Sequence, residues 1–129
     1  MALDVLIGTS GWGYDEWTGP FYPKVLRKEE YLTYYSQIFH TNEINTTFYN
    51  IPSINVVERW VEKTPENFKF SAKIPKAITH DAKLRITESL KILDYYLKAM
   101  QPLMNAEKLL AFLIQLPPFF KKEQNFGDL

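Results

Sequence analysis

The chain has 129 residues, of which 46% are hydrophobic and 16% aromatic, a composition that indicates one packed domain and excludes a disordered chain. Its 15 lysines and arginines balance 15 aspartates and glutamates, so nucleic acid is an unfavourable partner for a chain without net positive charge. The absence of cysteine excludes disulfides and thiolate metal sites, and two histidines are too few for a zinc centre without unusual ligands.

The first half of the chain predicts two strands, each followed by a helix. The apolar run 5–9 predicts a buried strand that ends in a glycine-rich loop. Apolar residues at helical spacing predict the first helix over 28–39. Residues 43–49 are rich in β-branched and aromatic side chains and predict the second strand. Ser53 is a suitable N-cap for a second helix over 53–63.

The second half repeats this pattern. Residues 68–74 predict the third strand, and 87–104 predict the third helix, in which Pro102 disturbs the last turn. The fourth strand is predicted over 109–116, before two prolines. Residues 121–129 are polar and are expected to be the interrupted start of a fourth helix.

Alternating strands and helices predict an α/β fold with parallel strands and right-handed crossovers. Repeated β/α units normally close as an eight-stranded TIM barrel of about 250 residues. We therefore expect residues 1–129 to form a single domain, an N-terminal (β/α)4 half of a TIM-barrel-like (β/α)8 fold, truncated in its fourth helix. The first and fourth strands of such a piece are open edges, so we expect self-association or pairing with a missing C-terminal half.

Polar residues fall at the C-terminal ends of the predicted strands. Side-chain alternation directs Glu43, Asn45 and Tyr49 of the second strand toward the barrel interior, together with Lys73 of the third and Gln115 of the fourth. A carboxylate and an ammonium meeting there can transfer protons, and a lysine of lowered pKa can form an imine with a carbonyl substrate. The alternative is a structural Glu43–Lys73 ion pair, with Asn45 and Gln115 satisfying the remaining hydrogen bonds.

His80 and a group of aromatic residues belong to the loops that face the same end of the sheet. A histidine there can act as an acid, a base or a hydrogen-bond donor, or can be merely solvated. Aromatic residues such as Trp12 and Tyr22 in the first loop can stack on sugars or bases, or can simply pack over the barrel mouth. The candidate catalytic residues are therefore Glu43, Lys73 and His80, and the candidate substrate-binding residues are Trp12, Tyr22, Asn45, Tyr49 and Gln115.

The sequence does not identify a cofactor. The segment 8–13 lacks both dinucleotide-binding spacing and a phosphate-loop lysine, and there is no nucleophile-elbow serine. A magnesium ion held by Glu43 and a substrate phosphate stays an open alternative. Neither a signal peptide nor an apolar run of membrane-spanning length is present, so we expect a cytoplasmic protein.

Several motifs follow one another over almost the whole chain. They comprise residues 7–12, Trp17 with 19–23, 43–49, 70–73, Thr79 with His80, and 115–119. Together they resemble the YecE-like family, which is a domain of unknown function. The resemblance implies a TIM-barrel-like fold of about twice this length and a site at its C-terminal mouth. It implies that this site uses Glu43, Asn45, Lys73, His80 and Gln115.

The resemblance supplies no reaction, and three functions stay open. In the first, the parent barrel is a small-molecule enzyme in which Lys73 and Glu43 handle protons or an imine. In the second, the loop aromatics bind a sugar, a base or a protein without catalysis. In the third, this half is inactive without the rest of the barrel.

Overall fold

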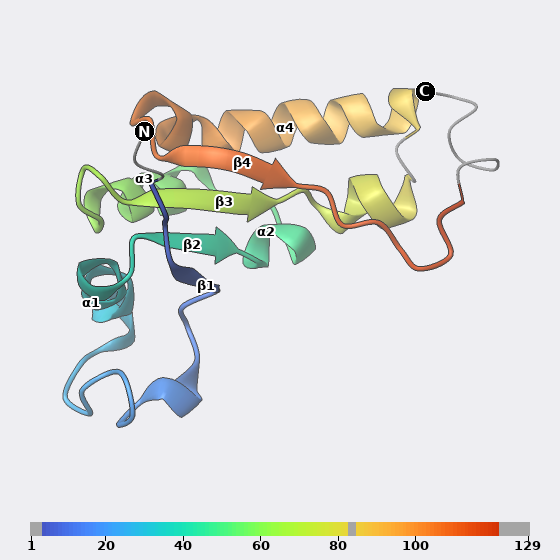
Figure 1. Cartoon of the computed structure of the whole chain (residues 1–129). Coiled ribbons are helices and arrows are strands. Elements are labelled where there is room, and N and C mark those ends of the chain that lie inside the picture. The colour runs from blue at the N-terminus through green and yellow to red at the C-terminus, as the bar shows by residue number, and fades with distance from the viewer. Residues whose placement is uncertain (1–3, 83–84, 122–129) are drawn as a thin grey trace.

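The computed structural model describes residues 4–82 and 85–121, and the described residues form a parallel sheet packed against helices (Figure 1). The four strands are β1 (Gly8–Ser10), β2 (Thr41–Ile44), β3 (Lys69–Lys73) and β4 (Leu109–Leu113). They lie in the order β1-β2-β3-β4, and each neighbouring pair is parallel. The predicted α/β class with parallel strands is confirmed.

Helices occupy each connection between strands. The α-helices are α1 (Tyr31–Ile38), α2 (Thr46–Tyr49), α3 (Ile54–Glu62) and α4 (Ile86–Asn105), with 3-10 turns at Asp15–Trp17 and Lys28–Glu30 and a π-helical turn at Ala77–Asp81. The predicted N-cap of α3 is confirmed, because the Ser53 hydroxyl accepts a hydrogen bond from the Val56 amide at 3.4 Å. No described helix has the length and apolar character needed to cross a membrane.

The second strand ends earlier than the sequence predicts. Residues 46–49 form α2, so the prediction of a strand through Tyr49 is wrong. The Thr47 hydroxyl donates to the Lys73 carbonyl oxygen at 2.7 Å, and Phe48 is buried, so tertiary contacts override the β propensity of this segment. The fourth strand is likewise shorter and stops at Leu113. The predicted start of a fourth helix lies, apart from Lys121, outside the described residues.

The hydrophobic core lies between the sheet and the helices. Alternate residues of the strands, including Ile44, Phe70 and Ala72, are at most 1% exposed and belong to this core, as does Phe68 directly before β3. The α-helices contribute other large members, which are Tyr31, Leu32, Tyr35, Val57, Trp60, Tyr96, Met100 and Leu103. This face of the sheet is called the covered face below. Because alternate residues of a strand point to the same face, its burial explains the apolar alternation that predicted the third strand.

The opposite face of the sheet carries polar residues and is called the open face below. Strand register places Ser10, Glu43, Ser71 and Ala111 in one row across all four strands. Glu43 and Ser71 are half-buried, whereas Ser10 and Ala111 are exposed. A register shift between β3 and β4 at Phe70 and Ser71 leaves Leu110 without a counterpart on β3.

Candidate functional site

A chain of hydrogen bonds links the ends of β1 and β2. The Asn45 amide nitrogen donates to the Ser10 hydroxyl, and that hydroxyl donates to a Glu43 carboxylate oxygen at 3.2 Å. Ser10 and Glu43 are register partners, so the parallel pairing of the strands brings these side chains together. The structure thus groups two of the predicted residues, Glu43 and Asn45, around a serine that the sequence analysis did not single out.

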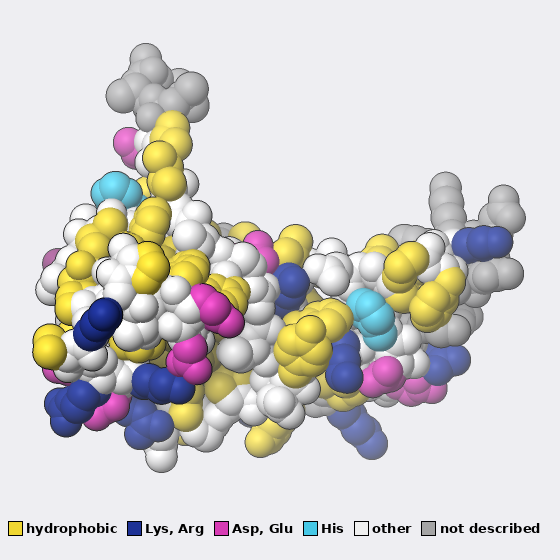
Figure 2. All heavy atoms as spheres, turned by 90° about the horizontal axis from the view of Figure 1, so that it is seen from below, with side chains coloured by type: hydrophobic (Ala, Val, Ile, Leu, Met, Phe, Trp, Pro, Cys, Tyr) yellow, Lys and Arg dark blue, Asp and Glu magenta, His cyan; other side chains and the backbone are white. Residues whose placement is uncertain are grey.

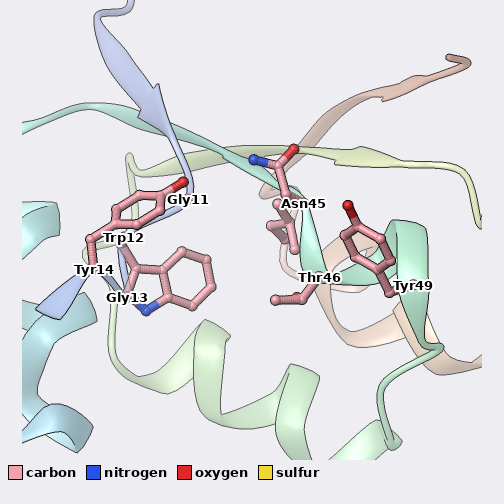
Figure 3. A pocket seen from close by; sticks show the side chains of 8 residues that line it. Gly11, Trp12, Gly13, Tyr14, Asn45, Thr46 and Tyr49 are labelled. Carbon is pink, nitrogen blue, oxygen red and sulfur yellow. The ribbon is translucent and has the colours of Figure 1, made fainter.

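Beside this chain lies a pocket of about 380 Å³, between the first loop and α2 (Figure 3). Trp12 and Tyr14 stand on one side of the pocket and Tyr49 on the other, with Thr46 between them. Its other lining residues are Gly11, Gly13, Ile44 and Asn45. Three predicted residues, Trp12, Asn45 and Tyr49, therefore meet at one site at the C-terminal end of the sheet.

The first loop is held in place by hydrogen bonds to its backbone. Gly11 has a φ of 77°, and its amide donates to the Glu43 carbonyl oxygen at 2.9 Å. The carbonyl oxygen of Gly11 accepts from the Asn42 side chain at 2.8 Å, and the Tyr14 hydroxyl donates to the Ser10 carbonyl oxygen at 2.5 Å. Asn42 is completely buried, and an amide side chain directly before the predicted second strand is the signal by which the sequence could have revealed a supporting residue.

The two aromatic candidates of the first loop occupy different environments. Trp12 is half-buried, and its ring lies edge-on to Trp60 of α3 at 5.8 Å, so it joins the pocket to the core. Tyr22 is completely buried and stacks on Tyr31 at 3.9 Å. Burial, followed by the nearby hydroxyls of Tyr35 and Tyr31, raises the pKa of Tyr22 above its usual value. Tyr22 does not line the pocket, and it supports the loop by donating to the Trp12 carbonyl oxygen at 2.6 Å.

Lys73 lies apart from Glu43. The five ion pairs between described residues do not include these two, so the predicted pair is not formed. The register explains this, because Glu43 lies beside Ser71, two residues before Lys73 on β3. The Lys73 ammonium instead lies 5.6 Å from the centre of the Phe48 ring, a cation–π distance.

His80 joins Lys73 at the same aromatic ring. It lies in the π-helical turn, where its Nδ1 is 2.9 Å from the Thr79 hydroxyl and its ring is 5.1 Å from that of Phe48. Phe48 also contacts the neighbouring ring of Tyr49, at 5.1 Å. The candidate residues therefore form two groups, one around Ser10 and one around Phe48, with Tyr49 between them. Gln115 is exposed beyond the end of β4.

Metal ligands do not cluster in the part of the chain that the structure describes. There, no group of three or more histidine, aspartate or glutamate side chains is arranged to hold a metal ion. Glu43 is the carboxylate of the site, and its neighbours Ser10 and Asn45 are neutral. All three of these side chains can form hydrogen bonds to a ligand.

Comparison with known families identifies the chain's relatives. The model of a protein family of unknown function, DUF72, matches residues 6–129. The chain belongs to the DUF72 family. It is 32% identical to the UPF0759 protein YunF of Bacillus subtilis over 97% of this chain and 44% of YunF. It is 33% identical to the UPF0759 protein YecE of Escherichia coli K12 over 90% of this chain and 39% of YecE.

Solved structures of DUF72 proteins share this fold. A protein from Thermotoga maritima superimposes with a TM-score of 0.76 at 30% identity, over 90% of this chain and 45% of that one. A protein from Enterococcus faecalis gives a TM-score of 0.63 at 31% identity, over 72% of this chain and 39% of that one. The predicted family resemblance is confirmed, and the chain spans less than half the length of these relatives.

Proposed function

We propose that the protein binds a small ring-shaped ligand in the pocket between the first loop and α2. The observation that carries this proposal is the arrangement of Trp12 and Tyr49 on opposite sides of a pocket that Asn45 also lines. Aromatic side chains flanking a gap stack on flat rings, and a few polar groups beside them fix the orientation of a ligand. The carboxyl ends of parallel strands are also where ligands bind in α/β proteins.

The polar groups of the site favour a ligand that donates hydrogen bonds. Glu43 offers carboxylate oxygens, of which one accepts from Ser10. The Asn45 side-chain oxygen is buried and has no hydrogen-bond partner among the described residues. Leaving such an oxygen unpaired costs about 1–3 kcal/mol, so a donor that reached it would stabilise a complex. A ring bearing hydroxyl or amino groups, such as a sugar or a base, has this chemistry.

A second candidate function is catalysis in a complete barrel. Glu43 is half-buried and is not neutralised by a cation within 4.0 Å in the described part of the chain, so it is available as a proton acceptor for a ligand hydroxyl. A ligand extending past Tyr49 would meet the group formed by Lys73, Phe48 and His80, whose ammonium suits an anionic substituent. In this proposal, the enzyme uses the group around Ser10 and the group around Phe48 for different parts of the ligand. The reaction of the whole protein also depends on residues outside this chain.

Ligand binding can be tested with a tyrosine exchange that has a matched control. Tyr49 and Tyr95 are 65% and 64% exposed, and only Tyr49 lines the pocket. Monosaccharides and nucleosides would be screened against the chain by saturation-transfer NMR, and we expect Tyr49→Ala to weaken binding of a hit at least tenfold. Tyr95→Ala should leave the affinity unchanged, and Glu43→Gln should weaken it for hydroxyl donors. Equal affinities for wild type and Tyr49→Ala would contradict the proposal.

A further inference from the structure

Two lysines and a histidine surround an aromatic pair beside the pocket between the first loop and α2, called the ligand pocket below. The Lys73 ammonium lies 5.6 Å from the centre of the Phe48 ring, and the Lys76 ammonium lies 5.7 Å from the centre of the Tyr49 ring. The His80 ring is 5.1 Å from that of Phe48. Since the rings of Phe48 and Tyr49 are themselves 5.1 Å apart, the three basic side chains form one group, called the basic group below.

The positive charge of the basic group is not neutralised within the part of the chain that the structure describes. The five ion pairs there involve other side chains, and the exposed Asp81, which follows His80, forms none with this group. Figure 2 shows lysine or arginine side chains and a histidine beside a hydrophobic patch, on the half of the molecule away from the N-terminal segment. A cation–π contact leaves the N–H donors of an ammonium available, so these lysines can bind an anion.

Hydrogen bonds hold the backbone and the imidazole of the basic group in place. The carbonyl oxygen of Lys73 accepts from the hydroxyls of Thr47 and Tyr96, at 2.7 Å and 3.0 Å, which ties the end of β3 to α2 and α4. The Nδ1 atom of His80 is 2.9 Å from the hydroxyl of Thr79, a completely buried residue. With that hydroxyl as the donor, neutral His80 carries its proton on Nε2, where it can donate to an oxyanion.

We propose that the basic group binds the phosphate of a phosphorylated ring compound, a sugar phosphate or a nucleotide, whose ring lies in the ligand pocket. This inference rests on the proposed binding of a ring between the first loop and α2. A phosphomonoester carries a charge of about −1.5 to −2 at neutral pH and three acceptor oxygens. Two ammonium groups and an imidazole N–H match that charge and those oxygens, whereas a carboxylate offers one charge and two oxygens.

The two strands that bear the site give such a ligand a direction. Glu43 is the register partner of Ser71, so Lys73 lies two residues farther along β3, a distance of about 6–7 Å. The Glu43 carboxylate repels a phosphate and accepts hydrogen bonds from the hydroxyl or amino groups of a ring. We therefore expect the donors of the ring to face Glu43 and Asn45, and the phosphate to face the basic group.

Matched compounds with and without a phosphate test this inference on the whole chain. Isothermal titration calorimetry would give the affinities of glucose and glucose 6-phosphate, and of adenosine and adenosine 5′-monophosphate. Glucuronate would serve as the carboxylate control and inorganic phosphate as the control without a ring. We expect the phosphorylated member of one pair to bind at least tenfold more tightly than its parent compound. The pair that shows this preference distinguishes a sugar phosphate from a nucleotide.

The other outcomes separate the phosphate site from the ring pocket. Measurable and equal affinities within both pairs would overturn the phosphate site and leave the ring pocket standing. Glucuronate binding as tightly as glucose 6-phosphate would overturn the choice of phosphate over carboxylate. Inorganic phosphate binding as tightly as the phosphorylated compounds would contradict the ring pocket instead. If none of these compounds bound, both the phosphate site and the proposed function would be overturned.

Lysine substitutions locate the phosphate. Lys73→Met and Lys76→Met each remove an ammonium and keep an unbranched side chain, and we expect each to reduce the preference for the phosphorylated compound at least fivefold. Lys98→Met is the control, because it changes the net charge equally but removes a lysine of α4 that pairs with Asp94 and lines a different pocket. Thermal unfolding would show that the variants stay folded. An unchanged preference in both Lys73→Met and Lys76→Met, or an equal fall in Lys98→Met, would overturn the assignment.

Discussion

The two faces of the sheet differ in how completely the chain buries their side chains. On the covered face, Phe68 and Phe70 are at most 1% exposed and belong to a core that also contains aromatic and aliphatic residues of α1, α3 and α4. On the open face, Glu43, Ser71 and Lys73 are half-buried, and Lys73 rests on an aromatic ring rather than beside a carboxylate. The chain's own core thus stabilises one face, while the polar side chains of the other stay partly exposed.

The largest expected effect is a difference in stability between substitutions on the two faces, made at two neighbouring residues of β3. Phe70 is completely buried and its ring lies near those of Phe68, Trp60 and Trp12. Phe70→Ala should lower the free energy of unfolding by about 3–5 kcal/mol through lost burial and a cavity. Ser71→Ala, on the open face, should change it by less than about 0.5 kcal/mol. Urea unfolding would measure the free energy of unfolding of both variants. Similar losses of stability would contradict the difference between the two faces.

A smaller effect concerns the loop that borders the ligand pocket. A Cβ atom at Gly11 would lie 2.6 Å from the Tyr14 hydroxyl oxygen, in a backbone conformation with φ of 77°. Gly11→Ala should therefore cost about 1–3 kcal/mol and displace Tyr14 from the pocket wall. Gly13 is the matched control, because a Cβ there meets nothing within 4 Å. Thermal unfolding would show the difference, and an equal cost at both positions would refute this account of the loop.

The smallest effect concerns the contact that joins α4 to the strand bearing Lys73. The Tyr96 hydroxyl donates to the Lys73 carbonyl oxygen at 3.0 Å, so Tyr96→Phe should cost about 1 kcal/mol at neutral pH. Burial raises the pKa of Tyr96 to about 12, from 10.0 in the unfolded chain. Between these values the unfolded state loses a proton that the folded state keeps, so stability falls as the pH rises.

Because phenylalanine has no such proton, stability of Tyr96→Phe should fall less steeply than that of wild type between pH 10 and about 12. Equilibrium unfolding at a series of pH values would provide both curves. Parallel curves of stability against pH would mean that the buried hydroxyl of Tyr96 does not cause the loss of stability at alkaline pH. The other buried tyrosines are common to both proteins, so they cancel in the difference.

The length of each strand shows where sequence patterns succeed and fail. Strict alternation of Phe68, Phe70 and Ala72 predicted the third strand to within one residue at each end. Residues 46–49 were predicted as strand because they are β-branched and aromatic, but form α2. Their conformation depends on the Thr47 hydrogen bond to Lys73, a residue 26 positions away, which no local propensity records.

The candidate site divides in the same way. The sequence predicted Glu43, Asn45, Trp12 and Tyr49 from their places at strand ends and in the first loop. In the structure, Asn45, Trp12 and Tyr49 line one pocket. Hydrogen bonds through Ser10 link Glu43 to Asn45 of this pocket. The sequence could not separate Tyr22 from Trp12, since both are aromatic residues of one loop. Their roles diverge because Tyr22 stacks on Tyr31 in the core, whereas Trp12 reaches the pocket.

By itself, the sequence determined the alternation of strands and helices and the family, and it predicted that polar residues gather at the C-terminal end of the sheet. These follow from local periodicity and from motifs that are contiguous in the chain. Only the tertiary structure decided that Glu43 meets Ser10 rather than Lys73, and that residues 46–49 form α2 rather than the end of a strand. Register between strands fixes such neighbours, and register depends on contacts between residues that are distant in sequence.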